Sequence, residues 1–70
     1  MADQIQSALV ILRRRQVEAR VGLRRSTLYA RIAEGTFPAP IRIGARSVGW
    51  VEAETTEWLR ARLAEREAAR

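Results

Sequence analysis

The chain has 70 residues, which suffices for one small domain with a limited hydrophobic core. It contains no cysteine and no histidine, which excludes disulfides, thiolate nucleophiles and the usual zinc-binding sets, so we expect no enzyme and no cofactor. All 13 basic residues are arginine, against eight acidic residues, and the net charge of +5 favours an anionic partner, most often nucleic acid. A GC-rich genome alone can also produce an arginine-only set.

Residues 1–9 are expected to form a flexible arm, followed by a short strand at residues 10–13. Met1–Ser7 contains Asp3 and no basic residue, and the apolar run Ala8–Leu12 is only five residues long, so this end does not resemble a targeting signal. The end of that run is β-branched and apolar, which predicts the strand. No stretch is long and apolar enough to span a bilayer, and we expect a cytoplasmic protein without membrane contact.

A helix-turn-helix is predicted over residues 14–35. Apolar residues four positions apart mark one buried face in each helix. Gly22 ends the first helix and Gly35 the second, because glycine is the preferred residue after a helix end. The residues expected to be buried are Val17, Val21, Leu28 and Ile32.

A β-hairpin wing is predicted over residues 41–50 and a third helix over residues 52–66. The prolines in residues 37–40 prevent a helix from continuing, which makes this segment an extended connector. Two short runs of strand composition flank a turn with Arg46 at its tip. The apolar stripe of the third helix comprises Thr55, Trp58, Leu59 and Leu63.

Arginines occupy the starts of the first two helices, where the helix dipole disfavours positive charge. These are Arg13, Arg14 and Arg15 at the first helix, and Arg24 and Arg25 at the second. Each placement costs about 0.3–1 kcal/mol, which suggests that an external anion compensates. A phosphate group fits, because helix N-termini present free N–H groups and arginine adds charge and hydrogen bonds. The alternative is that these side chains extend into solvent.

The outward face of the second helix is small, polar and rich in hydroxyl groups. It carries Ser26, Ala30 and Glu34, with Thr27 and Tyr29 on its flanks. Such a surface can enter a major groove about 12 Å wide. Arg31 flanks the buried stripe and is expected to be a phosphate-binding or surface residue rather than one that reads a base. Alternatively, Ser26 and Thr27 only cap the helix and Tyr29 only covers the edge of the core.

Two arginines of the wing are further candidates for contact with nucleic acid. Arg46, at a tip flanked by small residues, suits a narrow, AT-rich minor groove, and its alternative role is an exposed turn residue. Arg42 points outward on its strand, opposite the neighbouring isoleucines, and is expected to contact a backbone phosphate. Trp50 and Trp58 are expected in the core, clamping the hairpin onto the third helix.

Three ordered blocks of the sequence carry a family resemblance that runs from about Ile11 to Arg66. They are Gly-Leu-Arg-Arg-Ser-Thr-Leu-Tyr at residues 22–29, Glu-Gly-Thr-Phe-Pro at 34–38, and Ile-Gly-Ala-Arg-Ser-Val-Gly-Trp at 43–50 with Glu-Trp-Leu at 57–59. They resemble the AlpA-type phage and prophage regulators, which are related to excisionases and to MerR-like winged-helix domains. The resemblance implies an α+β fold of the winged helix-turn-helix type.

The resemblance also implies a function. The helix from Arg25 to Ala33 would be the recognition helix in the major groove, and the hairpin would be the wing. Family members are small transcriptional regulators or recombination directionality factors of mobile elements, which implies a nucleoid-associated protein that binds double-stranded DNA. This sequence departs from the family pattern at two positions. Position 24 is commonly Ser in the family and is Arg here. The family commonly has Arg directly after the tyrosine at position 29, whereas here Ala30 takes that place and the arginine follows as Arg31.

One small module reads only a few base pairs, so we expect further components. These are several copies on adjacent sites or a homodimer, or a partner such as RNA polymerase or an integrase. The arm before Ile11 and the tail Ala64–Arg70 are candidates for contacts between copies. Two alternative functions stay open, namely an excisionase-type factor that bends DNA and an arginine-rich adaptor that binds an acidic protein.

Overall fold

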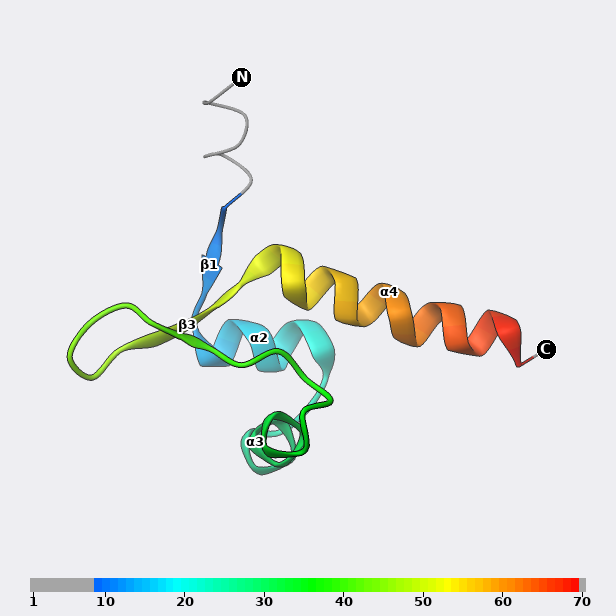
Figure 1. Cartoon of the computed structure of the whole chain (residues 1–70), viewed down its shortest axis with the longest axis horizontal. Helices are drawn as coiled ribbons and strands as arrows, with labels where there is room; N and C mark the ends of the chain where they lie inside the picture. Colours follow the sequence, from blue (N-terminus) through cyan, green and yellow to red (C-terminus); the bar gives the residue numbers. More distant parts are fainter. Residues whose placement is uncertain (1–8, 70) are drawn as a thin grey trace, which may run out of the picture.

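Three helices and a small antiparallel sheet make up the part of the chain that the computed structural model describes, residues 9–69 (Figure 1). This arrangement is an α+β domain of the winged helix-turn-helix type, which confirms the predicted fold class. The arm expected at residues 1–9 falls, apart from Leu9, outside the described residues. In chain order the elements are β1 (Ile11–Leu12), α2 (Arg14–Val21), α3 (Arg25–Glu34), β2 (Ile41–Arg42), β3 (Val48–Val51) and α4 (Glu52–Ala68).

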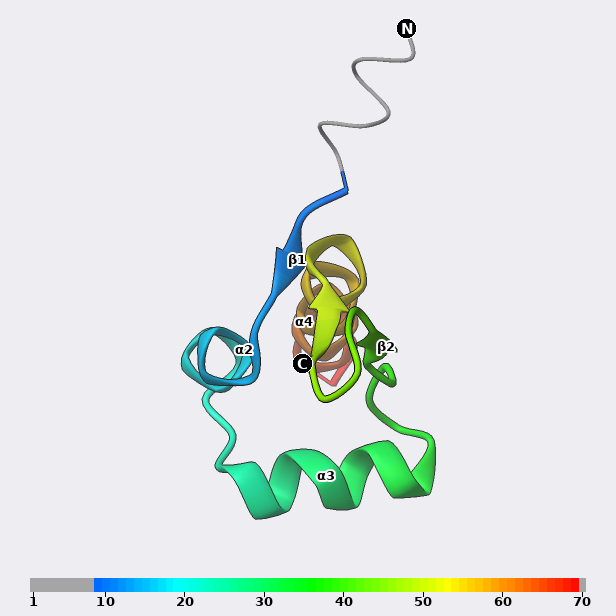
Figure 2. The ribbon, with the colours of Figure 1, turned by 90° about the vertical axis from the view of Figure 1, so that its left-hand side faces the viewer.

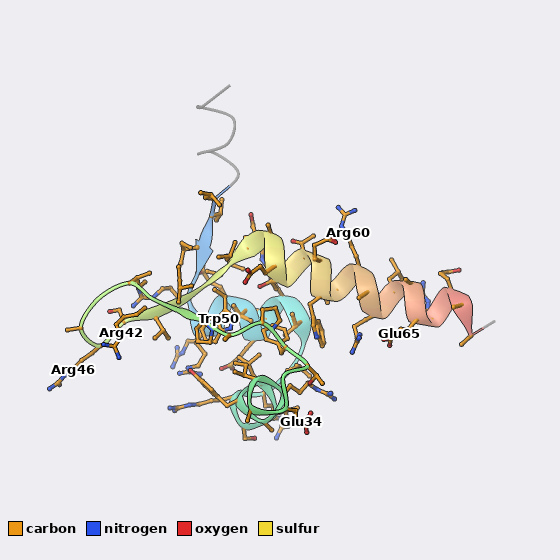
Figure 3. The ribbon with its side chains drawn as sticks, in the orientation of Figure 1. Glu34, Arg42, Arg46, Trp50, Arg60 and Glu65 are labelled. Atoms are coloured by element: carbon orange, nitrogen blue, oxygen red, sulfur yellow. The ribbon has the colours of Figure 1, made fainter. Side chains whose placement is uncertain are left out.

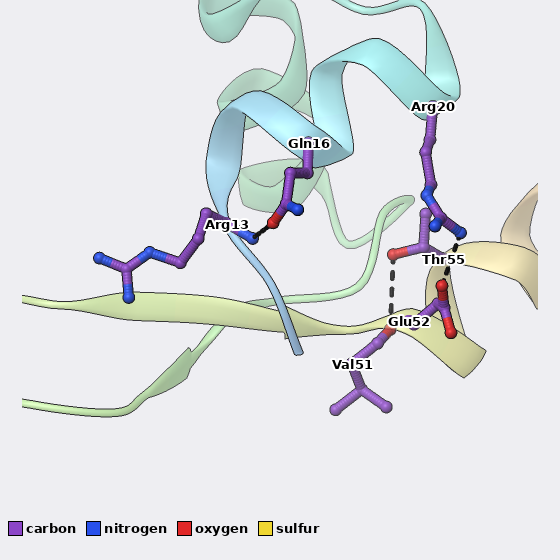
Figure 4. Close-up of polar contacts among 6 residues, drawn as sticks. All are labelled: Arg13, Gln16, Arg20, Val51, Glu52 and Thr55. Atoms are coloured by element: carbon purple, nitrogen blue, oxygen red, sulfur yellow. Dashed lines mark hydrogen bonds and ion pairs between the residues drawn. The ribbon is translucent and has the colours of Figure 1, made fainter. Parts of the chain in front are cut away.

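The boundaries of α2 and α3 are set by local features. At the start of α2, the side-chain oxygen of Gln16 accepts a hydrogen bond of 2.7 Å from the Arg13 N–H (Figure 4). Gly22 ends α2 with φ +72°, and Gly35 ends α3 with φ +82°, both in the left-handed region that favours glycine. The two helices are therefore joined by a short turn, as the sequence predicts.

The sheet has β3 in its centre, between β1 and β2, and both pairings are antiparallel. Ile11 pairs with Val51 on one side of β3, and Ile41 pairs with Gly49 on the other. A Cβ atom at Gly49 would lie 2.4 Å from the Ile11 side chain, so β1 can approach β3 this closely only because residue 49 is glycine.

The core lies between α2, α3 and the inner face of the sheet. Val17 and Leu28, two of the residues predicted to be buried, are fully enclosed, whereas Val21 and Ile32 are partly buried against them. Phe37, which belongs to the predicted extended connector, is buried as well. The buried apolar residues are Leu12, Val17, Leu28, Phe37 and Trp50.

Both tryptophans hold the connector after α3. The indole N–H of Trp50 donates to the Pro38 carbonyl at 3.0 Å, and that of Trp58 donates to the Thr36 carbonyl at 2.7 Å. Trp58 also meets Phe37 edge to face, with ring centroids 5.0 Å apart. The expected clamp therefore acts on the connector, and Trp58 is only half-buried.

The first turns of α4 are fixed to the domain, and the rest of the helix extends past it (Figures 1 and 4). Thr55 is buried and its hydroxyl donates to the Val51 carbonyl, while Glu52 pairs with Arg20 of α2 at 2.8 Å. Every described residue from Arg60 onward is exposed. Leu63, the last residue of the predicted apolar stripe, is half exposed, because it lies on the part of α4 that no other element covers.

Candidate nucleic-acid interface

The start of α3 has an arginine where a capping side chain would stand. Arg24 is the N-cap residue, with ψ 163°, and its side chain makes no capping hydrogen bond. The first helical hydrogen bond runs from the Leu28 N–H to the Arg24 carbonyl at 2.8 Å, so the N–H groups of residues 25–27 precede it. Three backbone donors and two exposed arginines, Arg24 and Arg25, therefore lie together at the positive end of the helix dipole.

Ser26 and Thr27 do not cap α3, which was the alternative role considered for them. Among the described residues, neither the Ser26 nor the Thr27 hydroxyl makes a hydrogen bond to the start of the helix, and both are exposed. Ala30, one turn along, is also exposed and adds no bulk. This face of α3 thus presents unused hydroxyl groups around a small side chain.

Tyr29 covers the edge of the core and also remains accessible for contact with another molecule. Its ring meets Trp50 edge to face, with centroids 6.3 Å apart, so it covers the edge of the core. The residue is nevertheless 38% exposed, on the flank of α3 next to the hydroxyl face. Its ring is therefore fixed by packing while part of its surface is free for another molecule.

Arg31 is held more firmly than the other arginines of α3. The residue is half-buried, and its Nε atom is buried without a hydrogen-bond partner among the described residues. The Arg31 carbonyl accepts hydrogen bonds from the N–H and the hydroxyl of Thr36, at 2.9 and 3.2 Å. Its stem lies against the protein, which restricts where the guanidinium can reach.

The wing turns Arg42 toward the side of the sheet on which α3 lies. Cross-strand partners share a sheet face, so Arg42 lies on the face of its partner Val48 and hence of Trp50, which contacts α3 through Tyr29. Arg42 is exposed as expected. It lies on the face of the sheet that carries the core, but outside the core itself. Ile41 and Ile43 occupy the other face and are 44% and 43% exposed.

Arg46 lies at the far end of the hairpin, away from the body of the domain (Figure 3). The turn is closed by hydrogen bonds of the Ile43 and Gly44 N–H groups to the Ser47 carbonyl, at 2.9 and 3.3 Å. Arg46 itself is exposed and forms no ion pair within residues 9–69. The structure therefore places this side chain at the tip of the wing.

The arginines of α2 differ in their surroundings, although the sequence groups them. Arg14 forms an ion pair with Glu18 one turn later, and Arg20, which was not a candidate, pairs with Glu52 of α4. Arg13 and Arg15 are exposed and have no acidic partner in the described chain. Arg15 lies nearly opposite the buried Val17 on the helix, and thus on its outermost face.

α3 and the wing share one side of the molecule, and α4 takes the other. Figure 2 shows α3 along the base, with its N-terminal end below α2 and its C-terminal end below β2, and no element covers its lower side. In Figure 1 the hairpin extends to the left of the body of the domain, at a level higher than that of α3. The helix face and the wing arginines can therefore contact one elongated anionic molecule together.

Two kinds of site are absent from the described residues. Residues 9–69 contain no group of three or more His, Cys, Asp or Glu side chains that could hold a metal ion. No helix in this part of the chain is long and apolar enough to cross a membrane.

Comparison with known proteins shows the family to which the chain belongs. The family model described as prophage CP4-57 regulatory protein (AlpA) matches residues 10–63. The chain is similar to the DNA-binding transcriptional activator AlpA of Escherichia coli K12, with 41% identity over 59 residues, covering 76% of this chain and 84% of that protein. It is also similar to the ORF88 protein of Enterobacteria phage P4, with 42% identity over 45 residues, which is 64% of this chain and only about half (51%) of that relative.

Proposed function

Because the chain belongs to the AlpA family of prophage regulatory proteins, we propose that it is a transcriptional regulator of a phage, prophage or other mobile element that binds specific sites in double-stranded DNA. It would act in the cytoplasm, at the nucleoid. The observation that carries this proposal is the start of α3, where Arg24 and Arg25 flank three N–H groups that precede the first helical hydrogen bond. This combination of donors and charge suits a DNA phosphate.

The recognition helix α3 would enter the major groove. Its exposed residues Ser26, Thr27 and Ala30 form a surface small enough to approach the bases, and Tyr29 contacts DNA with the part of its ring that Trp50 leaves free. Arg31 has a restricted reach because its stem is packed, and we assign it to a phosphate at the edge of the groove.

The wing would lie against the adjacent minor groove. Arg46 inserts its guanidinium there, which favours narrow, AT-rich sequence. Arg42, on the α3 side of the wing, contacts the phosphate backbone between the two grooves. At the start of α2, Arg13 and Arg14 contact phosphates. Arg15 lies on the outermost face of that helix and is not assigned a phosphate.

Regulation would require more than one module. A single recognition helix reads few base pairs, so we propose several copies on adjacent sites or a homodimer, with RNA polymerase or an integrase as a further partner.

Footprinting on the DNA that surrounds its own gene tests this proposal. We expect a protected site, and binding that weakens with salt with a log–log slope of about −3.6 if about four phosphates are contacted. Arg24→Ala together with Arg25→Ala should weaken binding without loss of fold. The matched control is Arg60→Ala with Arg66→Ala, which removes the same charge from exposed positions of α4; Arg60 is labelled in Figure 3.

The outcome separates the alternatives. An excisionase-type factor would use the same surface but bend its site, which a gel-shift series with circularly permuted fragments detects as position-dependent mobility. A protein-binding adaptor would leave duplex DNA unbound even at low salt. If the double variant and its α4 control lose DNA binding equally, the arginines at the start of α3 contribute only through the net charge of the protein.

A further inference from the structure

A groove of about 400 Å³ lies between α4 and the connector that follows α3, away from the proposed DNA-binding surface. Its walls are apolar and include an aromatic ring, a proline and the side-chain carbons of two exposed glutamates. Within residues 9–69, Glu54 and Glu57 form no ion pair, whereas the other glutamates of α4 are all paired with arginine. The residues that line the groove are Pro38, Ala53, Glu54, Glu57 and Trp58.

The groove suits an arginine side chain. The methylene stem of an arginine can lie against the apolar walls, while its guanidinium stacks on the Trp58 ring and binds one of the exposed carboxylates. Arg62 already lies near this ring, with its guanidinium 5.1 Å from the ring centroid, and it pairs with Glu65 at 2.7 Å. Arg62 therefore leaves Glu54 and Glu57 free for an arginine from outside.

An arginine of the required kind lies on the opposite side of the same chain. Arg15 is exposed, has no acidic partner in the described residues and stands on the outermost face of α2. Glu52 of α4 faces α2 through its ion pair with Arg20, and Glu54, two residues on, is rotated about 200° from it. Figure 2 accordingly shows α2 on one side of α4 and β2 on the other.

We propose that the groove receives Arg15 of a second copy of this chain bound to the neighbouring stretch of DNA. This inference rests on the proposed DNA-binding function. The groove and Arg15 cannot meet within one chain because they face opposite ways, so each copy can offer its arginine to one neighbour and its groove to the other. Such a contact is heterologous and joins copies head to tail, which predicts directly repeated binding sites rather than inverted ones.

Two duplexes from the DNA upstream of the gene test the contact. One is short, about 12 bp, and holds one copy; the other is about three times as long and holds several. Anisotropy titrations measure the affinity of each variant for both duplexes. The gain is the affinity per site on the long duplex divided by the affinity of the same variant for the short duplex. For the unmodified chain we expect a gain of about 5- to 20-fold.

Removing the two carboxylates should abolish this gain. The variant is Glu54→Gln with Glu57→Gln, and its control is Glu34→Gln with Glu67→Gln, which changes the net charge equally at exposed positions outside the groove. We expect both variants to bind the short duplex alike and only the first to lose the gain. Arg15→Glu should lose it too, and Arg15→Glu combined with Glu57→Arg, which restores the net charge, should recover it.

The results separate two failures. If the gain persists in the Glu54 and Glu57 variant, or disappears equally in its control, the groove does not receive a neighbouring copy. If the unmodified chain binds neither duplex, the DNA-binding function itself is wrong, and the head-to-tail contact with it. Circular dichroism melting of each variant establishes that the chain is folded at the temperature of the titration.

Discussion

The ring of Tyr29 meets that of Trp50 edge to face, with centroids 6.3 Å apart and planes at 65°. Tyr29 belongs to α3 and Trp50 to β3, the central strand of the sheet that carries the wing. Trp50 is fully buried and is fixed by its hydrogen bond to the Pro38 carbonyl. The pair therefore sets the distance between the two parts of the proposed DNA-binding surface.

Shortening Tyr29 should separate its two roles. Tyr29→Ala removes the aromatic pair, which is worth about 0.5–1.5 kcal/mol beyond its buried area, so we expect a melting temperature lower by several degrees. Tyr29→Phe keeps the ring and should melt like the unmodified chain. If the hydroxyl contacts DNA, Tyr29→Phe alone should bind several-fold more weakly. Thermal melts and titrations with the footprinted site measure both quantities. Unchanged binding by Tyr29→Phe would exclude a hydroxyl contact, and unchanged binding by Tyr29→Ala would leave the residue a purely structural role.

Replacing Arg24 by serine should raise stability and lower DNA affinity at once. A serine at the N-cap can accept a hydrogen bond from the free N–H groups of α3, which stabilises a helix by about 1 kcal/mol. The loss of one charged phosphate contact should cost about 1.5–3 kcal/mol of binding and reduce the salt slope by about 0.9.

Arg24→Ala is the matched comparison for the serine variant. It should lose the same affinity without the gain in the free energy of unfolding, which urea titration measures. A serine variant that binds DNA as tightly as the unmodified chain would show that Arg24 does not contact phosphate.

Local patterns predicted the helices and their ends well, because those features depend on neighbouring residues. The spacing of Val17 from Val21 and of Leu28 from Ile32 places α2 and α3, and Gly22 and Gly35 end them. The same holds for the absence of a cap at Arg24, which is visible from the residue type. These features locate the start of α3, the centre of the candidate site.

The errors concern which surfaces other elements cover, and a periodic pattern does not contain that information. Leu63 fits the helical stripe of α4, but the domain ends before this residue and leaves it exposed. Strand alternation separates Ile41 from Arg42 without indicating that the isoleucine lies on the uncovered face of the sheet. Phe37 is buried in the core, and Trp58 contacts it from a helix 21 positions later in the chain. Such contacts depend on the tertiary arrangement.

Adding a methyl group at Gly49 should destabilise the fold and the wing with it. The new Cβ would lie 2.4 Å from the Ile11 side chain and 3.3 Å from the Leu12 carbonyl, so we expect Gly49→Ala to lower the free energy of unfolding by about 1–3 kcal/mol. Gly44→Ala is the control in the same hairpin, because its Cβ would meet only the Ser47 side chain, at 3.5 Å. Urea titrations compare the two, and Ile11→Ala combined with Gly49→Ala should recover part of the loss by making room.

Removing Arg46 should change which DNA is preferred rather than only how tightly DNA is bound. Its guanidinium, at the tip of the wing, is proposed to enter a minor groove that is narrow and strongly negative where the sequence is AT-rich. Arg46→Ala should therefore weaken binding about five- to tenfold to sites whose wing-side flank is A·T, and much less where that flank is G·C. Arg42→Ala should weaken both equally, because a phosphate contact carries no sequence information. Competition titrations with the two flanks measure the ratio, and a ratio unaffected by Arg46→Ala would place the tip of the wing outside the minor groove.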